Sequence, residues 1–189
     1  MTNQIQNSNI NIKGQQKLLR IARQTLEAYL KDGSTPDFAV NDQQLNQACG
    51  VFVTLWQDGR LRGCIGEFVS REPLYKLVQK KAIDAAIHDP RFYPLCADDL
   101  RSVRIEISVL SPCRKINDWQ KIKLGRDGVL LKNGAHAATF LPQVATETGW
   151  GLTEFLNHLC LKAGLSDDAY LDRNTLFYTY SAQVFQENV

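Results

Sequence analysis

The chain has 189 residues, of which 44% are hydrophobic and 22% charged, which is typical of one globular domain large enough to bury a core. A net charge of +2 argues against a nucleic acid or a membrane surface as the main partner. Five cysteines, with no Cys-x-x-Cys pair and no apolar leader, argue against a disulfide-bonded secreted protein. We therefore expect a cytoplasmic chain without a membrane span.

The chain begins with a polar stretch and continues into a helix. Residues 1–13 are rich in Asn and Gln, and we expect a flexible tail there, ahead of a single domain over residues 14–189. Apolar side chains recur at helical spacing over residues 15–31, which predicts an amphipathic helix that ends at Gly33.

A β-hairpin is predicted next. Residues 51–56 are apolar with little alternation, which indicates a strand buried on both faces. Asp58-Gly59 is a strong signal for a two-residue turn. If pairing continues regularly from that turn, the first residues of the next strand lie opposite the apolar residues of the first strand, in apolar surroundings. The expected partners are Gln57 with Arg60, Leu55 with Arg62, and Val53 with Cys64.

The second strand of this hairpin carries the hexapeptide Leu-Arg-Gly-Cys-Ile-Gly at residues 61–66. Strand side chains alternate, so Arg62 and Cys64 are expected on the same face. A guanidinium beside a thiol favours the thiolate and can hold an anion. Gly63 and Gly66 leave room for a ligand or another backbone to come close. The alternative is a structural cysteine buried in a tightly packed strand.

A second helix and a half-buried strand follow. Ser70 is the expected N-cap of the helix, which must end before Asp89-Pro90. Residues 103–109 alternate between apolar and polar side chains, which predicts a strand with Glu106 on its polar face.

The C-terminal half combines short strands with short helices. We expect a meander over residues 122–124, 129–132 and 135–141, a helical turn from Pro142, a helix over 153–163 capped by Thr153, and a final strand over 176–185. Hairpins with helices grouped between them indicate an α+β fold, with antiparallel or mixed sheets and flanking helices, rather than a parallel α/β sheet.

The hexapeptide at residues 61–66 resembles the signature of the AMMECR family, and the resemblance covers nearly everything after the N-terminal tail. The further matching segments are residues 50–55, 89–92 with 94–95, 107–110, 125–128, 141–145, Glu147 with Trp150, and 162–165.

The resemblance implies an α+β fold with two sub-lobes and a cleft near the signature strand. In prokaryotes such proteins are encoded beside a MEMO-like protein and a radical SAM enzyme, as component A of the AmmeMemoRadiSam system, so these two proteins are the implied partners. Membership supplies a fold and a context but no reaction.

Candidate site residues fall into two groups. Cys64 and Arg62 are the candidate catalytic residues, with Cys64 as nucleophile or redox thiol and Arg62 as anion holder. The candidate substrate-binding residues are Gly63, Gly66, Glu67, Asp89, Arg91, Glu106, Gln143 and Glu147. For Asp89 and Arg91 we favour the structural alternative, an ion pair that staples the loop.

A general base is not evident. Glu67 or Glu106 could serve if either faced the cleft, although an ordinary surface carboxylate is the simpler interpretation. No spacing among His88, His136 and His158 predicts a Cys-His dyad or a zinc site. We expect no metal and no cofactor.

Three functions remain open. The first is an enzyme or enzyme subunit with a Cys64/Arg62 cleft site for an anionic or carbonyl-bearing small molecule. The second is a non-catalytic scaffold or binding component for the MEMO-like and radical SAM proteins. The third and least favoured is nucleic-acid binding through basic side chains near Trp119. These basic residues are Lys121, Lys123, Arg126 and Lys132.

Overall fold

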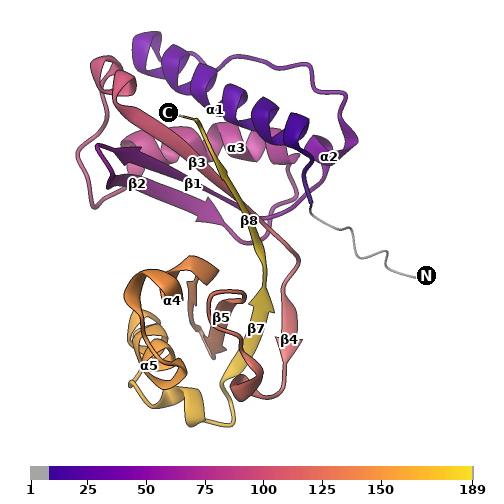
Figure 1. Ribbon diagram of the computed structural model, residues 1–189, viewed down its shortest axis with the longest axis vertical. Coiled ribbons are helices and arrows are strands. Elements are labelled where there is room, and N and C mark those ends of the chain that lie inside the picture. The colour runs from indigo at the N-terminus through magenta and orange to yellow at the C-terminus, as the bar shows by residue number, and fades with distance from the viewer. Residues whose placement is uncertain (1–8, 189) are drawn as a thin grey trace. The chain divides into compact units, whose positions relative to one another are not determined.

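The computed structural model describes residues 9–188 (Figure 1). These residues form two compact units, each with its own sheet and core. The first unit comprises the chain up to Leu110 together with the C-terminal segment from Gln183, and the second comprises residues 111–182.

The first unit is a four-stranded sheet in the order β2-β1-β3-β8, with helices on one face (Figure 1). The pairs of β1 with β2 and with β3 are antiparallel. Alternate apolar side chains of the central strands pack with those of the two long helices to form the core. The elements are α1 (Ile12–Asp32), α2 (Gln43–Asn46), β1 (Val51–Gln57), β2 (Arg60–Glu67), α3 (Leu74–Ile83), the π-helical turn η1 (Asp84–His88), the 3-10 turn η2 (Ala97–Arg101), β3 (Val103–Leu110) and β8 (Ala182–Gln186).

Helix α1 confirms the predicted amphipathic helix and extends it at its N-terminus. The Asn11 side chain caps the helix by accepting from the amide of Gly14, and Gly33 ends it at φ 76°. Ile10 is buried, and its amide donates to the side chain of Gln183 at 2.7 Å. The ordered chain therefore reaches further toward the N-terminus than the expected tail boundary at residue 13. Residues 1–8 of that tail lie outside the described residues.

The β1–β2 hairpin confirms the predicted turn but not the predicted register. Asp58 and Gly59 have φ of 50° and 75°, as a type I′ turn requires. Arg62 is an extra residue in β2, and the pairing shifts by one at this β-bulge. The expected pairs of Cys64 with Val53 and of Arg62 with Leu55 are therefore wrong. The observed pairs are Gln57 with Arg60, Trp56 with Leu61, Leu55 with Gly63, and Thr54 with Cys64.

Helix α3 begins later than predicted. Pro73 precedes its first residue, and no side chain caps it. Ser70 does not cap the helix; its hydroxyl accepts from the amide of Glu72 in the preceding turn. At the other end, one π-helical turn leads to Asp89, so the predicted stop before Asp89-Pro90 is confirmed.

The second unit is a four-stranded sheet in the order β4-β7-β5-β6, with α5 packed on its core. The expected strand over residues 122–124 is absent because a 3-10 turn and an irregular segment lie there. Helix α5 starts after Gly151 rather than at Thr153. The elements are β4 (Arg114–Ile116), η3 (Trp119–Lys121), β5 (Gly128–Asn133), β6 (His136–Phe140), α4 (Pro142–Thr148), α5 (Leu152–Lys162), η4 (Ala169–Leu171) and β7 (Leu176–Tyr180).

The predicted last strand is divided in two. Ser181 separates β7 from β8, and these two strands belong to different sheets. The Ser111 amide donates to the Ser181 carbonyl, and the Ser181 amide donates to the Ser111 hydroxyl, both at 2.9 Å. The prediction missed this division because a strand-like run of ten residues does not show at which residue a chain changes sheets.

Helices and antiparallel strand pairs together make this an α+β fold, as predicted. No helix in the described part of the chain combines the length and apolar character needed to cross a lipid bilayer.

Candidate functional site

Three polar side chains form a row across the face of the first sheet that is turned away from α1 and α3. Val53 and Leu55 point into the core between the sheet and these helices, so Thr54 points to the opposite face. Thr54 pairs with Cys64 on β2 and with Glu106 on β3, which places all three on that face. We call Cys64, Thr54 and Glu106 the polar row.

The Cys64 thiol is half-buried and hydrogen-bonded. The Thr54 hydroxyl donates to its sulfur at 3.3 Å, and Thr54 itself is buried. Burial raises the pKa of the thiol above its usual value. The Thr54 hydrogen bond and the charge of Arg91 act against this, while the charges of Asp89 and Glu106 raise the pKa further. Cys64 is therefore a protonated thiol at neutral pH.

Asp89 and Arg91 hold the backbone of Cys64 at the free edge of the sheet. The Cys64 amide donates to Oδ2 of Asp89 at 2.9 Å, and the Arg91 guanidinium donates to the Cys64 carbonyl at 3.1 Å. Because β2 is an edge strand, these two groups have no strand partner on that side. Asp89 and Arg91 satisfy them as a neighbouring strand does, and we call the pair the edge clamp.

The edge clamp is itself an ion pair. Arg91 donates from Nε and Nη2 to the two carboxylate oxygens of Asp89, at 2.9 and 2.7 Å. Asp89 is only 4% exposed. The hydrogen bonds from Arg91, followed by that from the Cys64 amide, hold the pKa of this carboxyl at about 2. This geometry matches the favoured interpretation of the two residues as an ion pair that staples the loop.

Arg62 does not act on the Cys64 thiol in the way its spacing suggested. As the extra residue of the bulge, Arg62 does not follow the alternation of side chains along β2. The cation that affects the pKa of Cys64 is instead Arg91. The pKa of Asp99 is lowered, chiefly by hydrogen bonds from Cys96, and the Arg62 charge contributes to this effect. Arg62 also lines a hollow of about 410 Å³ beside the hairpin turn.

The two glycines of the hexapeptide make room for the protein's own atoms rather than for a ligand. A Cβ on Gly63 would lie 2.0 Å from the carbonyl oxygen of Ala85 in η1. A Cβ on Gly66 would lie 2.4 Å from the Phe52 ring. Protein atoms therefore fill the space beside both glycines, which favours close packing as the reason for them over the expected approach of a substrate.

The remaining predicted site residues belong neither to the polar row nor to the edge clamp. Glu67 pairs with Lys81 at 3.2 Å. Gln143 and Glu147 lie on α4 in the second unit, where Glu147 is exposed. Of the predicted residues, the structure thus brings together Cys64, Asp89, Arg91 and Glu106.

The three histidines have other contacts. His88 lies 3.1 Å from the Asp84 carboxylate. In the second unit, His136 contacts the Ala163 carbonyl at 3.0 Å, and His158 stacks on Trp150. Across residues 9–188 no three His, Cys, Asp or Glu side chains are grouped in a way that could hold a metal ion.

Comparison with known proteins identifies the family of this chain. The AMMECR1 family model matches residues 19–185. The chain belongs to the AMMECR1 family. It is 40% identical over 179 residues to Protein MK0488 of Methanopyrus kandleri, covering 90% of this chain and 86% of that protein. It is also 40% identical over 181 residues to Protein PF1979 of Pyrococcus furiosus, with the same coverage.

A solved structure shares the fold. The crystal structure of the uncharacterized protein PH0010 from Pyrococcus horikoshii superposes with a TM-score of 0.89 at 38% identity, covering 95% of this chain and 94% of that one. These relatives establish the AMMECR1 family and its fold, and their names state no reaction.

Sequence reasoning missed three residues on the polar face of this AMMECR1-family sheet. Thr54 and Trp56 belong to an apolar run that indicates a strand buried on both faces, and Arg104 is one of several polar positions in the alternating strand over residues 103–109. The signal that finds them is the register between β1 and β3, which pairs Thr54 with Glu106 and Trp56 with Arg104.

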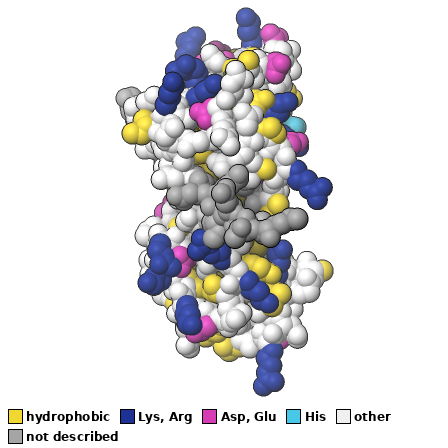
Figure 2. All heavy atoms as spheres, turned by 90° about the vertical axis from the view of Figure 1, so that its right-hand side faces the viewer, with side chains coloured by type: hydrophobic (Ala, Val, Ile, Leu, Met, Phe, Trp, Pro, Cys, Tyr) yellow, Lys and Arg dark blue, Asp and Glu magenta, His cyan; other side chains and the backbone are white. Residues whose placement is uncertain are grey.

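The basic residues near Trp119 do not lie together on one face of a strand. Lys121 ends a 3-10 turn and Lys123 follows in an irregular segment. Arg126 is paired with Asp127 at 2.7 Å, and Trp119 packs edge-on against Tyr170. On the surface shown in Figure 2, Lys and Arg side chains are interspersed with apolar and acidic ones. This AMMECR1-family chain thus gives little support to the nucleic-acid hypothesis.

Proposed function

We propose that the chain is an enzyme or enzyme subunit in which Cys64 adds to the carbonyl group of a small substrate. The observation that carries the proposal is the polar row, which places a thiol, a hydroxyl and a carboxylate on three adjacent strands of one sheet face. Such chemistry requires a nucleophile and an acid–base group, and the polar row contains both.

The proposed step needs a base because burial disfavours the thiolate. The sulfur of Cys64 forms a bond to the carbonyl carbon as the C=O π electrons move to oxygen. The thiol proton passes to the carboxylate of Glu106, and from there to the new alkoxide. The product is a hemithioacetal or hemithioketal, with Glu106 returned to its starting state. Thr54 holds the sulfur in place during this step.

The edge clamp supports this function by fixing the Cys64 backbone. Hydrogen bonds to both its amide and its carbonyl restrict the rotation of this residue, so the sulfur is presented at a constant position. By resemblance to the AMMECR family, we propose that the enzyme acts with a MEMO-like protein and a radical SAM protein.

Alkylation of Cys64 with iodoacetamide, mapped by mass spectrometry, tests the proposal. The exposed Cys96 serves as the internal reference. We expect an aldehyde substrate analogue to protect Cys64 and not Cys96. Glu106→Gln removes a charge that raises the pKa of Cys64, so it should accelerate alkylation by about 3- to 10-fold at pH 8 while slowing carbonyl addition. If Glu106→Gln accelerates both reactions, Glu106 is not the base.

A second function, a non-catalytic binding component, is favoured by the raised pKa of Cys64 and the tight packing of Gly63 and Gly66. Co-purification with the MEMO-like and radical SAM proteins distinguishes the two. This alternative requires a complex that survives in the Cys64→Ser variant and a Cys64 that no aldehyde protects. The enzyme proposal requires aldehyde protection of Cys64 whether or not a complex forms.

A further inference from the structure

Trp56 and Arg104 lie beside the polar row, and the polar groups of their side chains have no partner among residues 9–188. They pair with each other across β1 and β3, two residues along the strands from Thr54 and Glu106. The indole nitrogen of Trp56 is buried and has no hydrogen-bond partner among the described residues. The Arg104 guanidinium likewise makes no hydrogen bond or ion pair within residues 9–188. Both groups can only donate hydrogen bonds, so an acceptor, preferably an anion, satisfies both.

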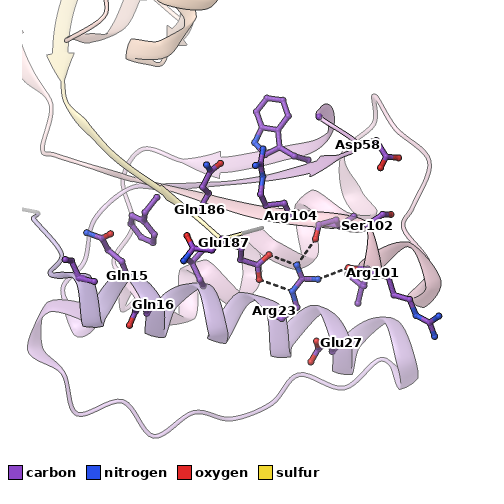
Figure 3. Close-up of a pocket in the computed structure, with 18 residues that line it drawn as sticks. Gln15, Gln16, Arg23, Glu27, Asp58, Arg101, Ser102, Arg104, Gln186 and Glu187 are labelled. Carbon is purple, nitrogen blue, oxygen red and sulfur yellow. Dashed lines mark hydrogen bonds and ion pairs between the residues drawn. The ribbon is translucent and has the colours of Figure 1, made fainter.

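Both side chains line a groove of the first unit (Figure 3). The groove has a volume of about 1080 Å³, which is ample for a small molecule. Arg101 and Ser102 also line this groove, and the Ser102 hydroxyl is already bonded to Gln57 and to the Asp99 carbonyl. The acidic Glu187 in the same groove is already paired with Arg23, so it does not neutralise Arg104 (Figure 3).

A third unpartnered group lies on the other side of the polar row. Ser108, on the same strand as Arg104 and Glu106, is 1% exposed, and its hydroxyl has no partner in the described chain. A buried polar group without a partner costs about 1–3 kcal/mol, and native proteins keep few of them. Such groups on both sides of Thr54 indicate a sheet face shaped for a polar ligand.

We propose that Arg104 and Trp56 bind the anionic group of the substrate whose carbonyl carbon reaches Cys64. This inference rests on the function proposed above and names its substrate class. The substrate is a carbonyl compound that also carries a carboxylate or a phosphate.

The register of the sheet sets the length of that substrate. Cys64 and Arg104 are two strands apart across the sheet and two residue pairs apart along the strands. With strands about 4.8 Å apart and about 6.8 Å between alternate residues, their backbone positions are separated by about 12 Å. A 2-oxo acid, with its two groups adjacent, bridges this distance only if the Arg104 side chain extends toward Cys64. An aldehyde whose charge lies several bonds from the carbonyl spans the distance.

Binding of the anion alone is tested without the thiol. Adipate and sorbitol 6-phosphate are titrated separately into the Cys64→Ser variant, and the indole N–H resonances are followed by NMR. Neither compound has an aldehyde or ketone group that a thiol could attack. We expect a saturable downfield shift of the Trp56 indole resonance, whereas the resonances of Trp119 and Trp150 should not shift. The Trp56 resonance is assigned by its loss in Trp56→Phe. The tighter of the two probes identifies the anion as carboxylate or phosphate.

Arg104→Gln should weaken that binding at least 10-fold, whereas Arg114→Gln on β4 serves as a matched control and should leave it unchanged. An unmoved Trp56 resonance, or a titration that is the same in Arg104→Gln, overturns the assignment of the anion site.

A series of aldehydes then connects the anion site to Cys64. Glyoxylate, succinic semialdehyde, adipic semialdehyde and erythrose 4-phosphate are compared as protectants of Cys64 against iodoacetamide. We expect the longer anions to protect at least 10-fold better than glyoxylate, and Arg104→Gln to abolish this difference. Equal protection in wild type and Arg104→Gln overturns the anion site but leaves the thiol function. Anion binding without any protection overturns the thiol function alone.

Discussion

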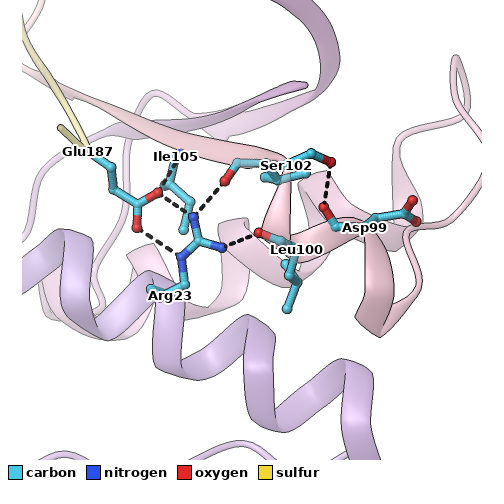
Figure 4. Close-up of polar contacts among 7 residues, drawn as sticks. Arg23, Asp99, Leu100, Ser102, Ile105 and Glu187 are labelled. Atoms are coloured by element: carbon cyan, nitrogen blue, oxygen red, sulfur yellow. Dashed lines mark hydrogen bonds and ion pairs between the residues drawn. The ribbon is translucent and has the colours of Figure 1, made fainter. Parts of the chain in front are cut away.

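The carboxylate of Asp89 accepts the backbone amide of Cys64 at 2.9 Å and so takes the place of a neighbouring strand. The same device recurs at the start of β3. There Glu187 accepts the amide of Ile105 at 2.9 Å, and Arg23 donates to the carbonyl of Val103 at 2.7 Å (Figure 4). In both places a carboxylate–guanidinium pair satisfies backbone groups that the sheet leaves open. Such pairs end a sheet without inviting another strand.

Asp89→Asn should destabilise the first unit. The substitution removes the charge that Arg91 and the Cys64 amide both bond, and a buried group is left poorly satisfied. We expect the free energy of unfolding in urea to fall by about 2 kcal/mol. Glu72→Gln, which breaks the exposed pair with Lys80, is the matched control and should cost less than about 0.5 kcal/mol. Equal effects would mean that the clamp contributes no more than a surface pair.

The contribution of Asp89 to stability should depend on pH. Its pKa of about 2 in the folded chain lies below the ordinary value of about 3.9. A lowered pKa stabilises the fold above pH 4, and this stabilisation, about 2 kcal/mol, is lost as the pH falls through about 2. The gap in unfolding free energy between wild type and Asp89→Asn should therefore close between pH 5 and pH 2. A gap that stays constant over this range contradicts the assignment.

Arg91 and Arg62 should differ in their effect on the thiol. The charge of Arg91 lowers the pKa of Cys64, whereas that of Arg62 acts on Asp99. At pH 8, Arg91→Gln should slow alkylation of Cys64 by about 3- to 10-fold, and Arg62→Gln should leave its rate unchanged. A slower rate in Arg62→Gln would restore the partnership that the spacing of the hexapeptide suggested.

Gly63→Ala should disrupt the first unit. Its new methyl group would meet the Ala85 carbonyl oxygen at 2.0 Å, so the π-helical turn or β2 must move. We expect a loss of at least about 3 kcal/mol, seen as a lower urea midpoint or as insoluble protein. Gly151→Ala, where nothing lies within 4 Å of the new atom, should change stability by less than about 1 kcal/mol. Similar stability of the two variants would show that β2 has room at Gly63.

Glu187→Gln should loosen the start of β3. The Ile105 amide donates to the Glu187 carboxylate, which Arg23 holds in position. Weakening this pair should speed hydrogen exchange of the Ile105 amide by about 10-fold, which corresponds to 1.4 kcal/mol of local opening. The Val53 amide, within the central strand, should exchange as before. Unchanged exchange at Ile105 would show that the pair does not limit opening there.

Local patterns in the sequence were enough for the elements with strong start and stop signals. Helical spacing and Gly33 predicted α1, Asp58-Gly59 predicted the first hairpin, and Asp89-Pro90 predicted the end of the second helix. The predicted N-cap at Ser70 was wrong because Pro73, three residues later, is equally compatible with the start of a helix. Only the packing of the unit selects between these two starting points.

The candidate site was predicted in part. Cys64 and Glu106 share a sheet face, as their strand positions allowed, and Asp89 with Arg91 forms the expected ion pair. Because β2 contains one inserted residue, Cys64 pairs with Thr54 instead of Val53, and Arg62 is not the cation that acts on the thiol. A bulge leaves no mark in composition or periodicity, because it is set by how the two strands fit together.

The sequence by itself determined the family, the α+β class and the residues capable of chemistry, because these depend on residue type and short spacings. Only the tertiary structure decided which of them meet. The contact of Asp89 with Cys64 joins segments 25 residues apart, and the row from Cys64 to Glu106 crosses three strands. Such contacts depend on strand order and register, which arise from the packing of the whole unit rather than from any local pattern.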